Sequence, residues 1–223
     1  MRTPGAIAPL ILGLPAVAWM YTSAALSLLR LVRDELPTGS RFIVEEGNSS
    51  CAEKRNTIVR GFLQNASSEY EHLLLLDSDM ICPPGMVGKL LAAQKDVVGV
   101  MYTIRFPPFH TVGGRTLRPD GTDPAPSHRC YPIAPGQGLQ RVDRVGGGVM
   151  LIRRAVLTRI APPWFAGMPE NTDADDFFFC QKVIDAGFEL WIDTDLEAAH
   201  LTIAPVTPGR AGAWRDAWEP AWL

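Results

Sequence analysis

The chain has 223 residues, of which 47% are hydrophobic and 20% are charged, and its 21 basic and 24 acidic residues give a net charge of −3. This composition excludes a disordered chain, and the near balance of charge excludes a polycation that binds nucleic acid nonspecifically. The 20 glycines and 19 prolines are scattered without a period, which excludes a collagen-like repeat. We therefore expect a globular α/β protein with many turns.

The first stretch of the chain has the composition of a targeting or membrane segment, because residues 3–29 carry no charge and follow Arg2. Prolines at positions 4, 9 and 15 interrupt it, and a second apolar run over residues 21–36 ends in charged side chains. We predict a strand within residues 7–14, a loop and a helix over residues 21–36, rather than a membrane span.

Strands and helices alternate in the next part of the chain. We predict a strand at residues 41–45, a helix after a capping box formed by Ser50 and Glu53, a strand at residues 72–76, a helix at residues 83–94 and a strand at residues 97–104. This alternation predicts a mostly parallel sheet with helices on both faces.

The second half of the chain begins with an excursion of loops and hairpins over residues 105–140, which is rich in glycine and proline. After it we predict a strand at residues 142–152, a short helix at residues 154–160, a helix from Thr172 to Gly187 and a last strand at residues 189–193. Residues 203–223 form a tail with three tryptophans, which we expect to cover the core; closure over the site and contact with a membrane interface are the alternatives.

Charge is distributed unevenly in this half. Residues 101–160 hold nine arginines and three aspartates, whereas residues 161–223 hold three basic and eleven acidic residues. The arginines either face an anionic ligand or pair with the acidic last third, and we favour the pairing slightly.

The four cysteines lie 31, 48 and 50 residues apart, without a closely spaced pair. This spacing argues against a zinc ribbon and predicts reduced thiols in a cytoplasmic protein, with peripheral contact to a membrane left open.

Asp77 and Asp79 directly follow the apolar strand at residues 72–76. In an open α/β sheet, the carboxyl ends of the strands border the ligand crevice. Carboxylates there suit Mg²⁺ or Mn²⁺, which links them to nucleotide phosphates. The alternative is a solvated turn, because aspartate and serine are common turn residues.

A second acidic cluster, Asp173, Asp175 and Asp176, opens a predicted helix. Capping explains one acidic residue there, but not three. A carboxylate at this place can act as a general base toward a hydroxyl. His200 follows the last strand and is a candidate third metal ligand, although a lone histidine is more often structural.

Three consecutive glycines, Gly146, Gly147 and Gly148, lie within the strand predicted at residues 142–152. Without side chains, they let a sugar approach the backbone and its N–H donors. A β-bulge without a ligand is the alternative.

The order of these motifs resembles that of GT-A glycosyltransferases, and particularly the compact family-2-like enzymes of phage and bacterial genomes. The matching stretches are residues 53–56, 72–80, 96–102, 142–154, 175–180 and the strand leading to His200, which together span about residues 5–202. The resemblance implies a GT-A fold with one catalytic domain over residues 1–202. Its nucleotide-sugar half covers about residues 1–104, and its acceptor half covers about residues 105–202.

The resemblance implies a metal-dependent glycosyltransferase. Such an enzyme moves a sugar from a nucleotide-diphosphate sugar, most often of UDP or GDP, to a hydroxyl acceptor with the help of Mn²⁺ or Mg²⁺. The acceptor remains open among a glycan, a lipid and a modified nucleic acid, and no obligate protein partner is implied.

The resemblance also assigns roles to single residues. It implies that Asp77 and Asp79 form the D-x-D motif, with Asp79 the direct metal ligand and His200 completing the metal site. Asp176 matches the general base, and Asp175 stands where glutamate is usual. On the nucleotide-sugar side, the implied residues are Glu46, Arg55, Asn56, Asp77, Gly147 and Gly148.

Two other functions fit parts of the sequence. One is a HAD-like phosphatase, in which Asp77 is a nucleophile, although the usual continuation of that motif is absent and two strand–helix units precede it. The other is a membrane-anchored binding protein without enzymatic activity, which uses residues 3–29 as its anchor.

Overall fold

The computed structural model of the protein describes residues 8–65, 67–105, 109–117, 121, 130–168 and 174–202. The predicted helix start at Thr172 and Asp173, the tail over residues 203–223 and much of the loop excursion lie outside these ranges.

The apolar N-terminal stretch forms a strand and a helix, as predicted. β1 (Ile11–Ala16) is buried along its whole length, and α1 (Thr22–Asp34) buries Ala24, Ser27 and Leu31. Within the described residues, no helix combines the length and the apolar character that crossing a bilayer requires.

The predicted capping box also forms at the start of the next helix. β2 (Arg41–Glu46) leads to α2 (Cys51–Asn65). The Ser50 N–H donates to Glu53 Oε2 over 2.9 Å, and the Glu53 N–H donates to Ser50 Oγ over 3.2 Å. These two bonds satisfy N–H groups that the helix itself leaves free, and they fix the first turn of α2.

The remaining elements follow the predicted order, with short strands added. They are β3 (His72–Leu76), β4 (Met80–Ile81), α3 (Met86–Ala92), β5 (Val97–Met101), β6 (Gly113–Arg115), β7 (Tyr131–Pro132), β8 (Leu139–Val142), β9 (Arg144–Val145), β10 (Val149–Arg153), α4 (Arg154–Arg159), α5 (Asp175–Asp185), β11 (Leu190–Glu197) and β12 (Ala199–His200).

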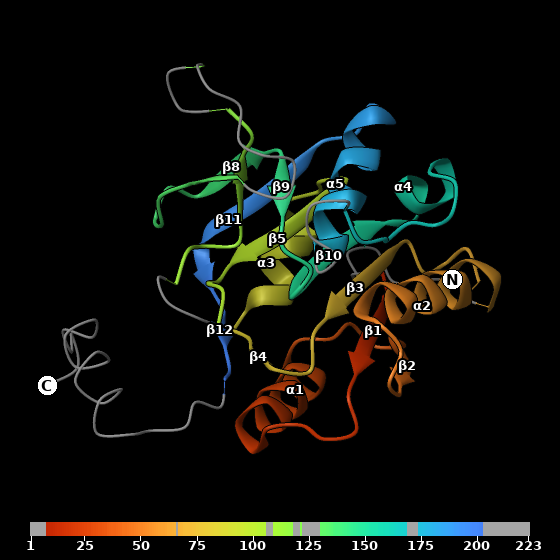
Figure 1. The fold of residues 1–223 in the computed structure, drawn as a ribbon. Helices are drawn as coiled ribbons and strands as arrows, with labels where there is room; N and C mark the ends of the chain where they lie inside the picture. Colours follow the sequence, from red (N-terminus) through yellow and green to blue (C-terminus); the bar gives the residue numbers. More distant parts are fainter. Residues whose placement is uncertain are drawn as a thin grey trace, which may run out of the picture.

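The central sheet has seven strands in the order β2-β1-β3-β10-β5-β11-β8 (Figure 1). Five of them point the same way, and only β10 and β8 run against their neighbours. The predicted α/β fold with a mostly parallel, Rossmann-like sheet is confirmed. Parallel pairing of β10 with β5 would need a crossover connection, usually a helix, and the described residues between these strands form only short strands and turns.

The single strand predicted at residues 142–152 is wrong. The three glycines divide it into β9, which pairs with β6 in a small three-stranded sheet, and β10, which lies in the central sheet between β3 and β5. The polar groups of this turn bond to other parts of the chain, since the Asp77 N–H donates to the Gly148 carbonyl over 3.0 Å.

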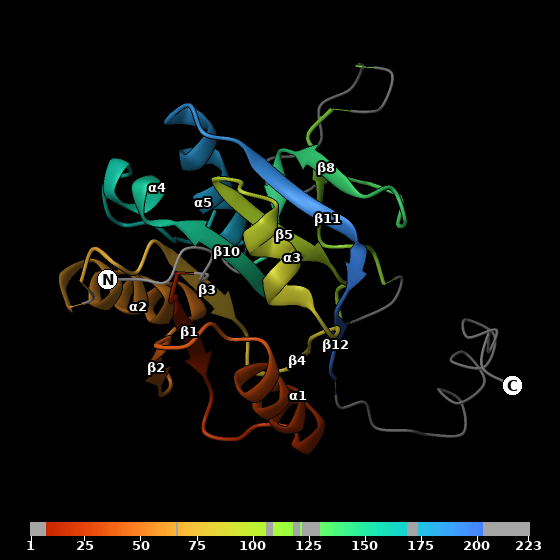
Figure 2. The ribbon, with the colours of Figure 1, turned by 180° about the vertical axis from the view of Figure 1, so that it is seen from behind.

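Helices cover both faces of the sheet, as predicted. α2, α4 and α5 pack on one face through side chains such as Phe62, Val156 and Phe179. α1 and α3 pack on the other face through Leu31 and Leu90, and Figure 2 shows α3 lying across the strands. Each face therefore has its own hydrophobic core.

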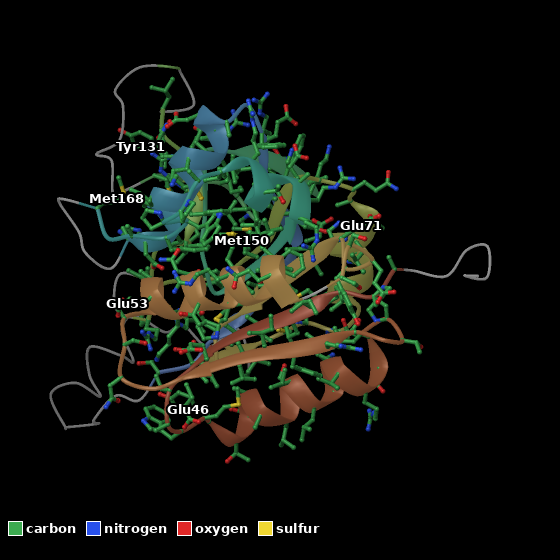
Figure 3. The ribbon with its side chains drawn as sticks, turned by 90° about the vertical axis from the view of Figure 1, so that its right-hand side faces the viewer. Glu46, Glu53, Glu71, Tyr131, Met150 and Met168 are labelled. Carbon is green, nitrogen blue, oxygen red and sulfur yellow. The ribbon has the colours of Figure 1, made fainter. Side chains whose placement is uncertain are left out.

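The parallel strands all end at the same edge of the sheet. In Figure 3, Glu46 at the end of β2, Glu53 in the first turn of α2 and Met168 lie along this edge, while Glu71, just before β3, lies at the opposite one. Side chains that follow β1, β3, β5 and β11 consequently meet there.

Candidate functional site

A buried arginine holds together the two acidic motifs that the sequence analysis singled out. Nη2 of Arg55, in the second turn of α2, donates to both carboxylate oxygens of Asp77 over 2.9 Å. Its Nη1 donates to both oxygens of Asp175 over 2.8 Å. The end of β3 and the start of α5 are thus tied to the same guanidinium.

Two members of this triad are almost completely buried. Arg55 is 3% exposed and Asp175 is 4% exposed. Burial opposes the charge on Arg55, but Asp77 and Asp175 outweigh it and raise the pKa of Arg55 above its ordinary value. Burial raises the pKa of Asp77, while the charge of Arg55 opposes that shift. Removing either partner would leave a buried charge uncompensated.

Asp176 lies beside this triad and accepts hydrogen bonds from two backbone N–H groups. Its Oδ2 accepts from the Gly147 N–H, and its Oδ1 accepts from the Phe177 N–H, each over 2.8 Å. Burial, together with the charge of Asp175, raises the pKa of Asp176 to about 6 against the opposing charge of Arg55. A carboxyl group with this pKa is suited to exchange a proton near neutral pH.

Asp79 and His200 face each other across the same edge. Asp79 Oδ2 lies 3.4 Å from His200 Nε2 and accepts a hydrogen bond from Arg105 Nη1 over 2.8 Å. Burial raises the pKa of Asp79, but His200 and Arg105 outweigh that effect, so the pKa lies below its ordinary value. Asp79 is therefore ionised at neutral pH.

The donor set at Asp79 fits a divalent cation in part. His200 Nδ1 lies 2.9 Å from the Thr103 carbonyl, which only accepts, so Nδ1 donates to that carbonyl and Nε2 is the ring atom directed toward Asp79. One carboxylate and one imidazole suit Mn²⁺ or Mg²⁺ when phosphate oxygens complete the coordination. Asp77 does not join them, and among the described residues no three acidic, histidine or cysteine side chains gather closely enough to hold a metal alone.

Two cavities open on either side of these residues. The larger, about 1060 Å³, extends over Asp175, Asp176 and Phe177. The smaller, about 320 Å³, extends under the end of β1 and is bordered by Trp19 and Tyr21. The cavities share four lining residues, namely Cys51, Asp77, Asp79 and Arg105.

The three consecutive glycines, Gly146–Gly148, leave space for neighbouring side chains of this site. The N–H of Gly147 is directed to Asp176, and the N–H of Gly148 donates to the Tyr102 hydroxyl over 2.9 Å. A Cβ at Gly147 would lie 2.5 Å from the Arg55 guanidinium. The absence of side chains therefore makes room for Arg55 and Tyr102, and Gly148 also lines the larger cavity.

Two residues from the resemblance lie away from the cavities. Asn56 is buried, and its amide oxygen accepts from the N–H groups of Trp164 and Phe165 while its amide nitrogen donates to the Phe165 carbonyl. It thus fixes the segment after α4. Glu46 is exposed at the end of β2 and lines neither cavity.

The site also contains residues to which the sequence analysis assigned no role. Tyr102 and Arg105 follow β5, and Trp19 and Tyr21 follow β1. Lys54 donates to the Ala16 carbonyl over 2.8 Å and lines the smaller cavity. The rule that ligands bind at the carboxyl ends of parallel strands applies to β1 and β5 as well as to β3, and it is the signal that points to these residues.

The described arginines of the second half, apart from Arg105, do not line the cavities. Arg141 pairs with Glu189, Arg153 lies 3.9 Å from Asp96, and Arg144 donates to Gln181. Within the described part of the chain, Arg105 is the one arginine of this segment that lines either cavity.

No protein-family model matches the sequence, and no curated protein does either. Solved structures do share the fold. Protein A197 from STIV superposes with a TM-score of 0.60 at 16% identity, over 87% of this chain and 86% of that one. The structure of GalNAc-T7 with UDP, GalNAc and Mn²⁺ superposes with a TM-score of 0.52 at 13% identity, over 87% of this chain but only 38% of that one. At these identities the likeness shows the fold alone.

Proposed function

We propose that the protein is a metal-dependent glycosyltransferase of the GT-A type, similar to the compact family-2-like enzymes. The observation that carries this proposal is the place of Asp79 and His200, which face each other where the two cavities meet. A general-base candidate, Asp176, lies in one of these cavities. A donor that spans both would expose its phosphates to a cation site and its sugar to a base.

The smaller cavity suits the nucleoside of the donor. Trp19 is 57% exposed, and its ring centroid lies 5.1 Å from that of Tyr21 in an edge-to-face arrangement. An exposed indole beside a narrow cavity offers a face on which a nucleobase stacks. We therefore place UDP or GDP here, with its diphosphate toward Asp79. Fold similarity to a protein whose structure contains UDP and Mn²⁺ agrees with this donor class.

Asp79 and His200 would hold Mn²⁺ or Mg²⁺, and the bound metal would neutralise the charge of the diphosphate. Asp77 contributes differently, because both of its oxygens accept from Arg55. Its pairing with Arg55 fixes the loop from which Asp79 projects.

The chain's own residues then define the transfer step. The acceptor hydroxyl oxygen forms a bond to the anomeric carbon, and the bond from that carbon to the phosphate oxygen breaks. The nucleoside diphosphate leaves with the electron pair, and the hydroxyl proton passes to Asp176. Gly147 and Phe177 hold this carboxylate in place through their N–H groups. This is general base catalysis in its ordinary form.

The acceptor side favours a neutral hydroxyl compound over a polyanion. The larger cavity is lined by Asp77, Asp79, Asp175 and Asp176, and its two arginines among the described residues, Arg55 and Arg105, are paired with these carboxylates. Because the net charge of this lining is negative, an anionic acceptor would be repelled. A neutral glycan, or a lipid with a neutral head group, fits the lining best.

The phosphatase alternative requires Asp77 to act as a nucleophile. Both oxygens of Asp77 accept hydrogen bonds from the buried Arg55, which lowers their reactivity. The membrane-anchor alternative requires residues 3–29 to leave the fold, yet β1 pairs with both β2 and β3 inside the central sheet. All four cysteines are free, which is typical of a reducing compartment such as the cytoplasm.

A turnover panel tests the proposed function. We expect release of nucleoside diphosphate from one of a set of UDP- and GDP-sugars, with Mn²⁺ present, and no release of phosphate from p-nitrophenyl phosphate. The opposite pattern would favour the phosphatase.

The pH dependence of this turnover tests the role of Asp176. The base must be ionised, and its pKa is raised to about 6, so activity should rise with pH through about 6 and level off above it. The charge of Asp175 contributes to this raised pKa, so Asp175→Asn should move the acidic limb to lower pH. The pH profiles of kcat/KM for both proteins are the measurement, and coincident limbs would contradict this account.

A further inference from the structure

Arg105 and His200 converge on the same oxygen atom. Arg105 Nη1 donates to Asp79 Oδ2 over 2.8 Å, and His200 Nε2 lies 3.4 Å from that same Oδ2. The guanidinium of Arg105 is always positively charged, so it supplies a permanent positive charge at this oxygen. Arg105 thus occupies the Asp79 oxygen to which a divalent cation would bind.

The ion pair between Arg105 and Asp79 can break at a small cost in free energy, so that another cation can replace Arg105. The Arg105 side chain is 45% exposed, whereas that of Asp79 is 19% exposed. A half-exposed ion pair contributes little free energy, because water screens it and a long side chain loses freedom in it. Arg55 differs in this respect, because it is buried between two carboxylates and has no comparable freedom.

Arg105 also lies where a diphosphate would bind. It is one of four residues that line both cavities, and the other three carry carboxylates or a thiol. A donor with its nucleoside in the smaller cavity and its sugar in the larger one must cross this junction. A guanidinium fork matches phosphate oxygens better than any other side chain at the junction.

We propose that Arg105 is an exchangeable cation: it neutralises Asp79 before the ligands bind, and it transfers to the diphosphate when a divalent metal takes its place on Asp79. This proposal rests on the proposed function, and it assigns Arg105 two opposite effects. Arg105 competes with the metal for Asp79, yet it strengthens binding of the nucleoside diphosphate.

The test is calorimetric titration of Arg105→Ala with two probes. In the absence of nucleotide, Mn²⁺ alone should bind the wild-type protein weakly, because two side chains complete only part of its coordination, and it should bind the variant up to about fivefold more tightly, since a competing ion pair of modest strength is gone. With saturating Mn²⁺, UDP or GDP should bind the variant about 10-fold to 100-fold more weakly, because a charge-assisted hydrogen bond to phosphate is lost.

Arg141→Ala is the matched control. Arg141 makes a surface ion pair with Glu189 at 3.2 Å and lines neither cavity, so its loss should leave both affinities unchanged. Arg105→Lys keeps the charge without the fork and should fall between the wild-type protein and the alanine variant in both titrations. Unfolding temperatures measured alongside verify that all variants fold.

Opposite changes in the two affinities support the proposal. Unchanged or weaker Mn²⁺ binding in Arg105→Ala, or unchanged diphosphate binding, overturns the role of Arg105 and leaves the transferase proposal standing. Failure of the wild-type protein to bind either diphosphate with Mn²⁺ overturns both.

Discussion

Replacing Asp176 by asparagine is expected to lower the kcat of donor turnover by about 10²-fold to 10⁴-fold, the usual contribution of a general base. The amide has the shape of the carboxylate but cannot accept the acceptor's proton. It keeps an oxygen for one of the two backbone N–H groups that Asp176 binds, those of Gly147 and Phe177, so the fold should persist. The measurement is the rate of nucleoside diphosphate release, with donor affinity determined separately.

Asp185→Asn is the control for this variant, because Asp185 lies on the same helix, accepts a surface hydrogen bond from Gln181 and is remote from the cavities. It should leave kcat unchanged. Full activity of Asp176→Asn would exclude the base role. A loss of donor affinity with unchanged kcat would instead make Asp176 a binding residue.

Replacing Arg55 by methionine is expected to lower the free energy of unfolding by about 3 to 5 kcal/mol, the usual result of removing one partner from a buried ion pair. Asp77 and Asp175 would then face each other's charge without the guanidinium between them. Denaturant unfolding at neutral pH measures this loss. The loss should shrink as the pH falls, because protonation removes the uncompensated charges.

A second substitution separates charge from packing. Arg55→Met combined with Asp175→Asn removes one of the two unpaired carboxylates, so the double variant should unfold less easily than Arg55→Met alone. If both proteins lose the same stability, the methionine side chain packs badly and the buried charges are not the cause.

The fold class follows from the sequence to a large extent, because local signals carry it. The apolar strand at residues 72–76 and the capping box of Ser50 and Glu53 both occur as predicted. The direction of β10 does not follow, since it depends on how a loop-rich segment returns to the sheet. The break in the strand at Gly147 does not follow either. A side chain at this position would collide with Arg55, which is distant in the sequence.

The candidate site is predictable only as a set of chemical groups. Asp77, Asp79, Asp175, Asp176 and His200 all line the larger cavity. Their partners depend on tertiary contacts that no spacing encodes: Arg55 reaches Asp175 across 120 positions of the chain.

The contacts of Asn56 and Arg105 could not be predicted from the sequence either. Asn56 adjoins Arg55 in sequence, but on a helix adjacent residues point in different directions. Its amide therefore meets the backbone of Trp164 and Phe165. Arg105 reaches Asp79 from the segment after β5, although β10 separates β5 from β3 in the central sheet, and no sequence pattern encodes this contact.

The measurement that tests the central claim most directly is a thermal-shift panel of UDP, GDP, CMP, dTDP and ADP, each with and without Mn²⁺, on the wild-type protein and on Asp79→Ala. A ligand that binds only the folded state raises the unfolding temperature by mass action. We expect one diphosphate to raise it only with Mn²⁺, and Asp79→Ala to abolish that increase. Absence of any shift in the wild-type protein, or an equal shift in Asp79→Ala, would contradict the account.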